Sequence, residues 1–269
     1  HLAPTMLRSI LDVIDQRPVS MDAVETIKYA SSPIPSETLE RAMRYFGPRL
    51  IQYYGLTEAG AIGTVLHKYA HHEASKGIHT DLMRSAGHPH LGCEIEIRRH
   101  DRSVCDVGED GEIWLRSNAM MSGYWNDPEK TKEAFAGQWC SVGDMAVRDQ
   151  DGFIHLVDRK SNMIISGGEN IYPSEVEGVL GAHEKVKDVA VLGVPHDKWG
   201  EAVHAFVVLH HEVEASEEEL IAWCKTRMAG YKRPQTIAFI QDEEMPRTAT
   251  GKILHRVLRQ SILQGTQKP

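Results

Sequence analysis

The stretch SVGDMAVRDQDGFIHLVDRKSNMIISGGENIYPSEVE, residues 141–177, contains the change of pattern that decides the fold. Its first part holds two strand patterns, SVGDMAVRD and GFIHLVDRK, separated by an Asp- and Gly-rich turn. After Arg159 and Lys160 the pattern changes: NMIIS predicts a strand, and Ser174 with Glu177 predicts a capping box that opens a helix. We therefore place a domain boundary near residue 160.

Upstream of this boundary the sequence shows two different patterns of predicted secondary structure. In residues 1–80, a strand pattern TIKYA, a helix pattern ETLERAMRYF capped by Ser36 and closed by Gly47, and a buried strand PRLIQYYG are typical of the end of a parallel α/β sheet. In residues 81–160, short strands such as CEIEIRR and GEIWLRS alternate with Gly, Asn and Asp turns. This second pattern predicts a compact antiparallel, barrel-like subdomain.

Downstream, residues 161–269 predict a small α+β domain. VKDVAVLGVP and EAVHAFVVLH read as strands, and SEEELIAWCKTRMAG reads as a helix with an acidic first turn and Gly230 at its end. The predicted fold class is therefore α/β plus α+β, in which the end of a large α/β domain with a barrel-like subdomain is followed by a small α+β domain.

Composition excludes several classes of function. The 269 residues carry 30 basic and 38 acidic side chains, a net charge of −8, which argues against a nucleic-acid or anionic-membrane surface. Four scattered cysteines without a C-x-x-C pair favour a reduced, cytoplasmic protein, and the 15 histidines show no metal-binding spacing. No apolar run is long enough for a membrane span. Because the chain begins without Met and almost directly in a helical pattern, we expect it to be a piece of a longer polypeptide.

The segment QYYGLTEAG, residues 52–60, groups side chains suited to a nucleotide. Tyr54 offers a flat face for stacking a base, and Gly55 would let a ligand approach the backbone closely. Thr57 offers a hydroxyl to a phosphate, and Glu58 offers a hard oxygen to Mg²⁺. A tyrosine-rich strand end followed by an ordinary helix start would explain the same residues.

Four further residues have a structural interpretation, and for Asp144 and Arg159 a functional one stands beside it. Asp144 at a strand end could accept the hydroxyls of a ribose, with Arg159 adding a charge-assisted contact, or the two could be a turn residue and a surface cation. Likewise, Gly167 and Gly168 could be a bulge.

The segment PRTATGKILHRVLR, residues 246–259, places Gly251 and Lys252 together, but it is no P-loop. That motif requires a glycine where Pro246 stands and a serine or threonine where Ile253 stands. The residues before Lys252 predict a flexible turn that presents it, followed by an amphipathic helix. Lys252 is either a solvated lysine at a helix start or a cation that serves a site elsewhere.

In order along the chain, YGLTE, GYWNDPEKT, the Asp144/Arg159 block, ISGGENIYPSEVE and PRTATGK closely resemble the adenylate-forming enzymes. These are the acyl- and aryl-CoA synthetases, the luciferases and the adenylation domains of peptide synthetases. The resemblance covers essentially the whole chain and is most like a fatty-acyl or aryl-CoA ligase. It implies an acid–thiol ligase that uses ATP, Mg²⁺ and CoA: a carboxylate attacks the α-phosphate of ATP, and a thiol then displaces AMP.

The resemblance also implies roles for individual residues. Tyr54 would stack on adenine, with Ala30, Ser31 and Ser32 on the other side of the base, and Gly55 would also belong to the nucleotide-binding site. Thr57 would hold phosphate, Glu58 the Mg²⁺, and Asp144 with Arg159 the ribose. Lys252 would be the adenylation lysine, contacting the α-phosphate and the carboxylate as charge builds up.

In this family the small C-terminal domain is mobile between the two half-reactions. The pivot position aligns with Ser161, where an aspartate or lysine is usual, and a small polar residue can still absorb the backbone change. Gly167 and Gly168 would line the pantetheine tunnel. Trp199, Tyr231 and Arg233 match positions that meet the CoA nucleotide, although Trp199 could equally be a packed surface aromatic.

The sequence lacks the family's phosphate loop upstream of YGLTE, so we expect its partner to be the missing N-terminal part of its own polypeptide and the chain to be inactive alone. Fatty, aryl and short branched acids all remain open as substrates. The alternatives are an adenylation domain that delivers to a carrier protein, a luciferase-like oxygenase, and a non-catalytic nucleotide-binding module.

Overall fold

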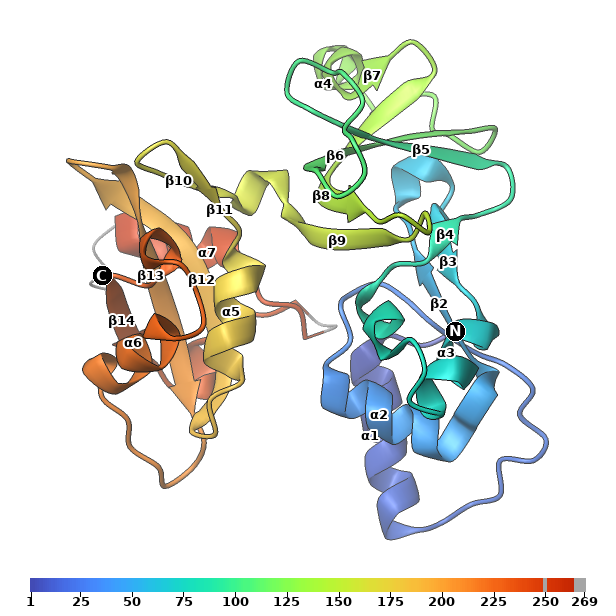
Figure 1. Ribbon diagram of the computed structural model, residues 1–269, viewed down its shortest axis with the longest axis horizontal. Coiled ribbons are helices and arrows are strands. Elements are labelled where there is room, and N and C mark those ends of the chain that lie inside the picture. The colour runs from blue at the N-terminus through green and yellow to red at the C-terminus, as the bar shows by residue number, and fades with distance from the viewer. Residues whose placement is uncertain (249–250, 264–269) are drawn as a thin grey trace. The chain divides into compact units, whose positions relative to one another are not determined.

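The structure, a computed structural model, describes residues 1–248 and 251–263 and divides into two compact units, His1–Leu156 and Val157–Pro269 (Figure 1). The sequence predicts the boundary between residues 160 and 161. In the structure the division lies four residues earlier, so Arg159 and Lys160 belong to the second unit. The two units are described separately below.

Unit 1 opens with a four-stranded sheet in the order β1-β2-β3-β4. β1 (Ile27–Tyr29) and β2 (Leu50–Tyr54) are parallel, whereas β3 (Thr64–Leu66) and β4 (His88–Pro89) add to β2 in antiparallel fashion. A parallel pair needs a crossover connection, which α2 (Ser36–Phe46) supplies. The α/β part of the predicted fold class is confirmed, and its sheet extends to Pro89, past the subdomain limit predicted at residue 80.

Helices α1 (Pro4–Gln16), α2 and α3 (Lys68–Ser75) belong to the same part of unit 1. In α1 the buried residues Leu7, Leu11 and Ile14 recur at helical spacing and pack in one core with residues of α2, β1 and β2. The predicted cap of α2 is wrong, because Pro35 occupies the N-cap position and Ser36 is already helical. Gly47 does end this helix, at a positive φ of 52°.

The second sheet of unit 1 is antiparallel, in the order β5-β6-β8-β7 with β9 paired to β8. Alternate residues of its strands point into one core, which holds Ile95, Ile97, Ile113 and Leu115. This sheet matches the predicted barrel-like subdomain in fold class. Its elements are β5 (Cys93–Arg98), β6 (Asp110–Ser117), α4 (Pro128–Ala134), β7 (Phe135–Ala136), β8 (Trp139–Arg148) and β9 (Ile154–Arg159).

Unit 2 is a five-stranded sheet with helices on both faces. The strands run β11-β10-β13-β12, and β14 joins β13 in parallel. Both faces are covered, so β12 reads as an almost continuous apolar run. The elements are β10 (Ile164–Ser166), β11 (Glu169–Ile171), α5 (Pro173–Gly181), β12 (Val186–His196), β13 (Gly200–Leu209), α6 (Glu217–Lys225), β14 (Thr236–Phe239) and α7 (His255–Leu263).

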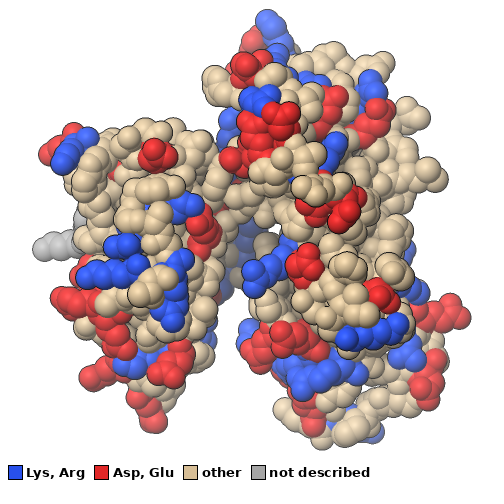
Figure 2. All heavy atoms as spheres, viewed as in Figure 1, with Lys and Arg blue, Asp and Glu red and all other residues tan. Residues whose placement is uncertain are grey.

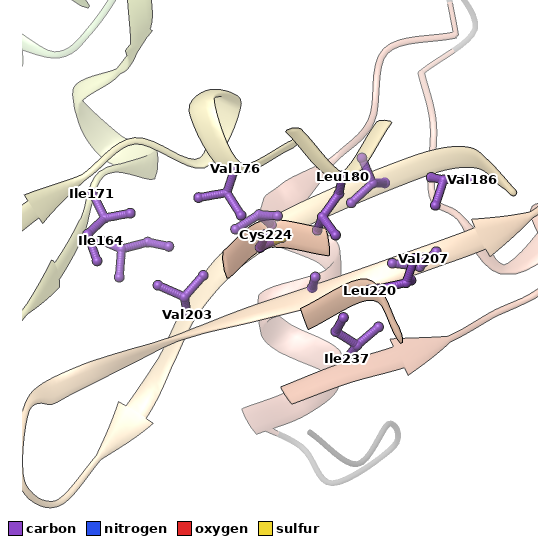
Figure 3. Packing of buried hydrophobic residues seen from close by; sticks show 13 residues of the cluster. Ile164, Ile171, Val176, Leu180, Val186, Val203, Val207, Leu220, Cys224 and Ile237 are labelled. Carbon is purple, nitrogen blue, oxygen red and sulfur yellow. The ribbon is translucent and has the colours of Figure 1, made fainter. Parts of the chain in front are cut away.

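The two faces of this sheet have separate cores. Val176 and Leu180 of α5 pack with Leu220 and Cys224 of α6 over one face (Figure 3). Leu258 of α7 packs over the other face with alternate residues of β12 and β13. The α+β part of the predicted fold class is thus confirmed.

The predicted capping box at α5 is wrong. Tyr172 is the N-cap residue, and Ser174 lies within the first turn. The Asp158 carboxylate accepts a hydrogen bond from the Ser174 amide at 2.8 Å and so satisfies one of the unpaired amides at this helix end. Glu177 instead accepts from the Val191 amide at 2.8 Å and ties α5 to β12.

Helix α6 begins as predicted but ends early. The Ser216 hydroxyl caps it by accepting from the Glu219 amide at 3.2 Å, and three glutamates occupy the first turn. The helix stops at Lys225, and Gly230 starts a separate 3-10 turn, Gly230–Lys232. Acidic and basic side chains are interspersed over the face of each unit seen in Figure 2. Within residues 1–248 and 251–263, no helix combines the length and apolar character that crossing a membrane requires.

Candidate active site

The loops after β1 and β2 leave the same edge of the first sheet. The strands are parallel, with Tyr29 opposite Gln52, so their carboxyl ends lie together, where ligands of open α/β sheets bind. The predicted adenine residues Ala30, Ser31 and Ser32 follow β1 directly. Ser31 adopts a φ of +85°, a conformation that costs a serine free energy and is concentrated at functional sites.

Tyr54 and Asp144 are in direct contact, although they are far apart in the sequence. The Tyr54 hydroxyl donates a hydrogen bond to Asp144 Oδ2 at 2.6 Å. Tyr54 ends β2 of the first sheet, and Asp144 lies on the inward-facing side of β8 in the second sheet, where it is 8% exposed. The structure thus brings together the two residues predicted to bind adenine and ribose.

Gly55 is required by the fold of its own loop. A Cβ atom there would lie 2.3 Å from the carbonyl oxygen of Ala61, which leaves no room for any other residue. Close approach of a ligand to Gly55 stays a prediction. The backbone that approaches Gly55 here is that of residues 61–62, which turn back toward the end of β2.

Glu58 lies half-buried in the 3-10 turn Thr57–Ala59, and Thr57 beside it is exposed. The Tyr124 hydroxyl donates to Glu58 Oε1 at 3.2 Å. Burial and then the nearby Glu58 charge raise the pKa of Tyr124, and the same two causes raise the pKa of Cys140 to about 11. Sequence reasoning did not assign Tyr124 a role, although the GYWNDPEKT segment contains it.

A metal at Glu58 would have few protein ligands. The described residues contain no group of three His, Cys, Asp or Glu side chains that could hold an ion. Mg²⁺ commonly takes one or two carboxylates and completes its shell with water and substrate phosphates. A single carboxylate beside an exposed threonine hydroxyl fits that pattern.

Arg159 and Ser161 belong to unit 2, whereas Asp144 belongs to unit 1. Arg159 is exposed at the end of β9, and Ser161 is exposed in the 3-10 turn Lys160–Asn162. The Asp158 carboxylate accepts from the Arg159 amide at 2.6 Å and from Asn162 Nδ2 at 3.2 Å. These two hydrogen bonds to Asp158 stabilise the start and the end of the turn, a role of Asp158 that the sequence did not indicate.

Gly167 and Gly168 form the turn between β10 and β11. Their φ angles are +61° and +89°, and two consecutive positive values are typical of a two-residue hairpin turn, so the bulge alternative does not apply. The Gly167 amide donates to the Trp199 carbonyl at 2.9 Å. The Trp199 ring stacks on His196 with ring centroids 4.6 Å apart. Three of the predicted CoA residues are therefore close together.

The other two predicted CoA residues lie before β14. Tyr231 is 49% exposed in the 3-10 turn Gly230–Lys232. Arg233 Nη2 donates to the Lys225 carbonyl at 3.2 Å, which ties this turn to the end of α6. Lys232 between them forms an ion pair with Glu175 at 2.7 Å.

Lys252 is exposed on a short hairpin-like turn before α7. The Thr248 amide donates to the Lys252 carbonyl at 2.8 Å, and the Lys252 amide donates to Thr248 Oγ1 at 3.1 Å. Gly251 takes a φ of +84°, and residues 249–250 of the predicted turn lie outside the described residues.

His255, which begins α7, contacts Glu177 Oε1 at 2.7 Å. Burial opposes protonation of His255, but the hydrogen bond and charge of Glu177 outweigh it and raise the pKa above its usual value.

Two sequence families match the chain in the order that the two units follow. The family described as AMP-binding enzyme matches residues 1–125, and the AMP-binding enzyme C-terminal domain matches residues 175–252. The chain belongs to the adenylate-forming enzyme superfamily. The predicted recognition is confirmed.

Curated members of the superfamily are similar along nearly all of the chain. The medium/long-chain-fatty-acid–CoA ligase FadD8 of Mycobacterium tuberculosis is 35% identical over 98% of the chain and 46% of its own length. A feruloyl-CoA synthase from an Amycolatopsis species is 37% identical over 95% of the chain and 50% of its own length. The chain therefore spans about half the length of the curated relatives it matches.

Solved structures of the superfamily agree with the fold. The amide bond synthetase McbA of Marinactinospora thermotolerans matches with a TM-score of 0.84 and 32% identity, over 96% of the chain and 51% of that structure. The o-succinylbenzoate CoA synthetase MenE of Bacillus subtilis, in complex with its acyl-adenylate intermediate, matches with a TM-score of 0.81 and 35% identity, over 96% and 50%.

Proposed function

We propose that this chain is part of an ATP-dependent carboxylic acid:CoA ligase that forms an acyl-adenylate and then an acyl-CoA thioester. The observation that carries the proposal is the 2.6 Å contact between Tyr54 and the buried Asp144, beside the loop of residues 30–32. The contact holds the Tyr54 ring, at the carboxyl end of β2, beside the buried carboxylate of β8, an arrangement that suits the base and ribose of a nucleotide.

In the first half-reaction, a carboxylate oxygen of the acid attacks the α-phosphorus of ATP. The bond from that phosphorus to the bridging oxygen breaks, and pyrophosphate leaves. Lys252 would offer positive charge to the α-phosphate and the acid, and Thr57 a hydroxyl to phosphate. Glu58 would hold Mg²⁺, which when bound neutralises phosphate charge.

In the second half-reaction, the thiol of CoA loses its proton, its sulfur attacks the acyl carbonyl carbon, and AMP leaves with the electron pair of the acyl–oxygen bond. Unit 2 would move between the half-reactions about Ser161, carrying Lys252 away. Gly167 and Gly168 would then face the pantetheine arm. Trp199, Tyr231 and Arg233 would meet the CoA nucleotide, and Arg159 would assist at the ribose.

The carboxylic acid substrate could belong to at least two chemical classes. FadD8 is named for medium- and long-chain fatty acids and the Amycolatopsis relative for ferulate, an aryl acid, at similar identity. We expect the acid to be selected mainly by the part of the polypeptide that these relatives have beyond the span of this chain. A panel of fatty, aryl and short branched acids, with pyrophosphate release as the readout, would identify it.

A second candidate has the same first step but an amine as the acceptor. It is favoured by the similarity to McbA, which is named an amide bond synthetase. In that case an amine nitrogen attacks the acyl carbonyl, loses a proton and displaces AMP. The acyl-adenylate formed by the full-length polypeptide should therefore be offered CoA and a panel of amines in parallel.

These experiments separate the alternatives. Acid-dependent pyrophosphate release followed by CoA-dependent thioester formation supports the ligase, and amide formation without thioester supports the second candidate. Failure of every acid in the panel to release pyrophosphate from ATP would favour the non-catalytic nucleotide-binding module. We also expect residues 1–269 alone to make no acyl-CoA, and turnover without added polypeptide would contradict that expectation.

A further inference from the structure

The segment GYWNDPEKT, residues 123–131, includes the end of the loop after β6 and the first residues of α4, and no step of the proposed reaction uses it. Its side chains nevertheless form an ordered set of contacts. The Tyr124 amide donates to Thr131 Oγ1 at 2.9 Å, and Thr131 Oγ1 donates to the Asp127 carbonyl at 2.8 Å. The Asp127 carboxylate caps α4 by accepting from the Lys130 amide at 3.0 Å.

Gly123 allows the loop to lie directly against α4. A Cβ atom at Gly123 would lie 2.9 Å from Thr131 Cγ2, and the φ angle of +151° is one that other residues rarely adopt. Glycine is therefore required at position 123 as long as Thr131 packs against it. This packing, together with the hydrogen bond from the Tyr124 amide to Thr131 Oγ1, fixes the backbone of Tyr124.

This fixed backbone directs the Tyr124 hydroxyl to Glu58. The hydroxyl donates to Glu58 Oε1 at 3.2 Å, and the Met121 amide donates to the Glu58 carbonyl at 2.8 Å. The loop thus holds Glu58 at both its backbone and its side chain. Lys130 Nζ lies 4.4 Å from the centroid of the Tyr124 ring, which adds a contact to the ring of the same tyrosine.

We propose that Tyr124 is a positioning residue that fixes the Glu58 carboxylate for a magnesium–nucleotide complex, an inference that rests on the role proposed for Glu58. A glutamate side chain has several rotamers, and a bond from the phenol to Oε1 selects one and gives Oε2 a defined direction. Groups that orient a ligating carboxylate in this way typically change metal affinity or activity by about 10- to 100-fold when removed.

The test measures the gain in ATP affinity that Mg²⁺ provides, by calorimetry on the full-length polypeptide without any carboxylic acid. For Tyr124→Phe we expect this gain to fall about tenfold, while ATP affinity in EDTA stays unchanged. Tyr45→Phe is the matched control, because Tyr45 also donates to a carboxylate, Asp15 Oδ1 at 2.5 Å, on the exposed surface of α2. The control should keep the full gain.

Two outcomes would overturn the proposal: an unchanged Mg²⁺ gain in Tyr124→Phe, or an equal loss with Mg²⁺ and with EDTA, which is what a merely structural role predicts. If Tyr124→Phe does not fold, Thr131→Val decides instead, since it removes the acceptor for the Tyr124 amide and should reduce the gain by a smaller factor. No turnover is needed. Failure of the acid panel would therefore leave this result intact, and the reverse also holds.

Discussion

Tyr54 and Lys252 are held in opposite ways. Tyr54 bonds to the buried Asp144, a partner in a different sheet of unit 1. Lys252 is exposed, and its backbone bonds go to Thr248, four positions away in sequence. A surface that holds a nucleotide throughout a reaction benefits from rigid tertiary packing. A cation needed in only one half-reaction is better carried on a short local turn.

The sharpest test of this difference is Lys252→Ala in the full-length polypeptide. Loss of one preorganised positive charge should slow acid-dependent ATP–pyrophosphate exchange by about 100-fold or more. Thioester formation from supplied acyl-adenylate should be spared, because the role proposed for Lys252 is confined to the first step. Lys225→Ala, an exposed lysine at the end of α6, is the control. Equal loss in both half-reactions would remove the proposed role.

On the other side of the comparison, Asp144→Asn should weaken AMP binding by about 10- to 100-fold, since hydrogen bonds to a charged group contribute about 1.5–3 kcal/mol. Tyr54→Phe keeps the ring and removes only the hydroxyl, so its effect should be smaller. Equilibrium dialysis of AMP measures both. Normal AMP binding by the Asp144→Asn variant would show that this carboxylate does not contact the ribose.

A smaller effect is expected at the hairpin of unit 2. Gly168→Leu should slow thioester formation about tenfold while leaving adenylation unchanged, because the side chain would fill space proposed for pantetheine. Gly168→Ala imposes the same strain at a φ of +89° with far less bulk, and no atom lies within 4 Å of its added Cβ. If Gly168→Ala and Gly168→Leu slow the reaction equally, backbone strain and not bulk is the cause.

The smallest effect concerns pH and the anchor of the Lys252 turn. Because Glu177 raises the pKa of His255 in the folded state, the pair stabilises the fold fully below the unfolded pKa of about 6.5 and loses this contribution as pH rises through the folded pKa. We expect a contribution of less than about 1 kcal/mol, because burial of His255 offsets much of the gain from the Glu177 charge.

Urea midpoints between pH 5.5 and 8.5 would measure this slope. Glu177→Gln should flatten it, since glutamine has no charge but can still accept from the Val191 amide. His211→Gln, at a highly exposed histidine, should leave it unchanged. A slope that persists in the Glu177→Gln variant would assign the pH dependence to other groups.

Strands were easier to predict than helix ends. The apolar runs VKDVAVLGVP and EAVHAFVVLH correspond to β12 and β13, because a strand buried on both faces needs apolar residues at every position. The predicted N-caps Ser36 and Ser174 are wrong, because Pro35 and Tyr172 occupy the N-cap positions. At the start of α5 the Ser174 amide donates to the carboxylate of Asp158, which is distant in sequence, and no local pattern could indicate this bond.

The sequence by itself determined the fold class, the family and the set of candidate residues, because periodicity, turn residues and ordered motifs are local properties of the chain. Only the tertiary structure decided which of these residues touch. It showed that the Tyr54 hydroxyl bonds to Asp144 and the Tyr124 hydroxyl to Glu58. It also showed that Gly55 is required because the backbone of its own loop packs against it. Such pairs depend on how the parts of a domain pack together. Packing brings residues that are far apart in the sequence into contact, and local sequence patterns do not indicate which residues these are.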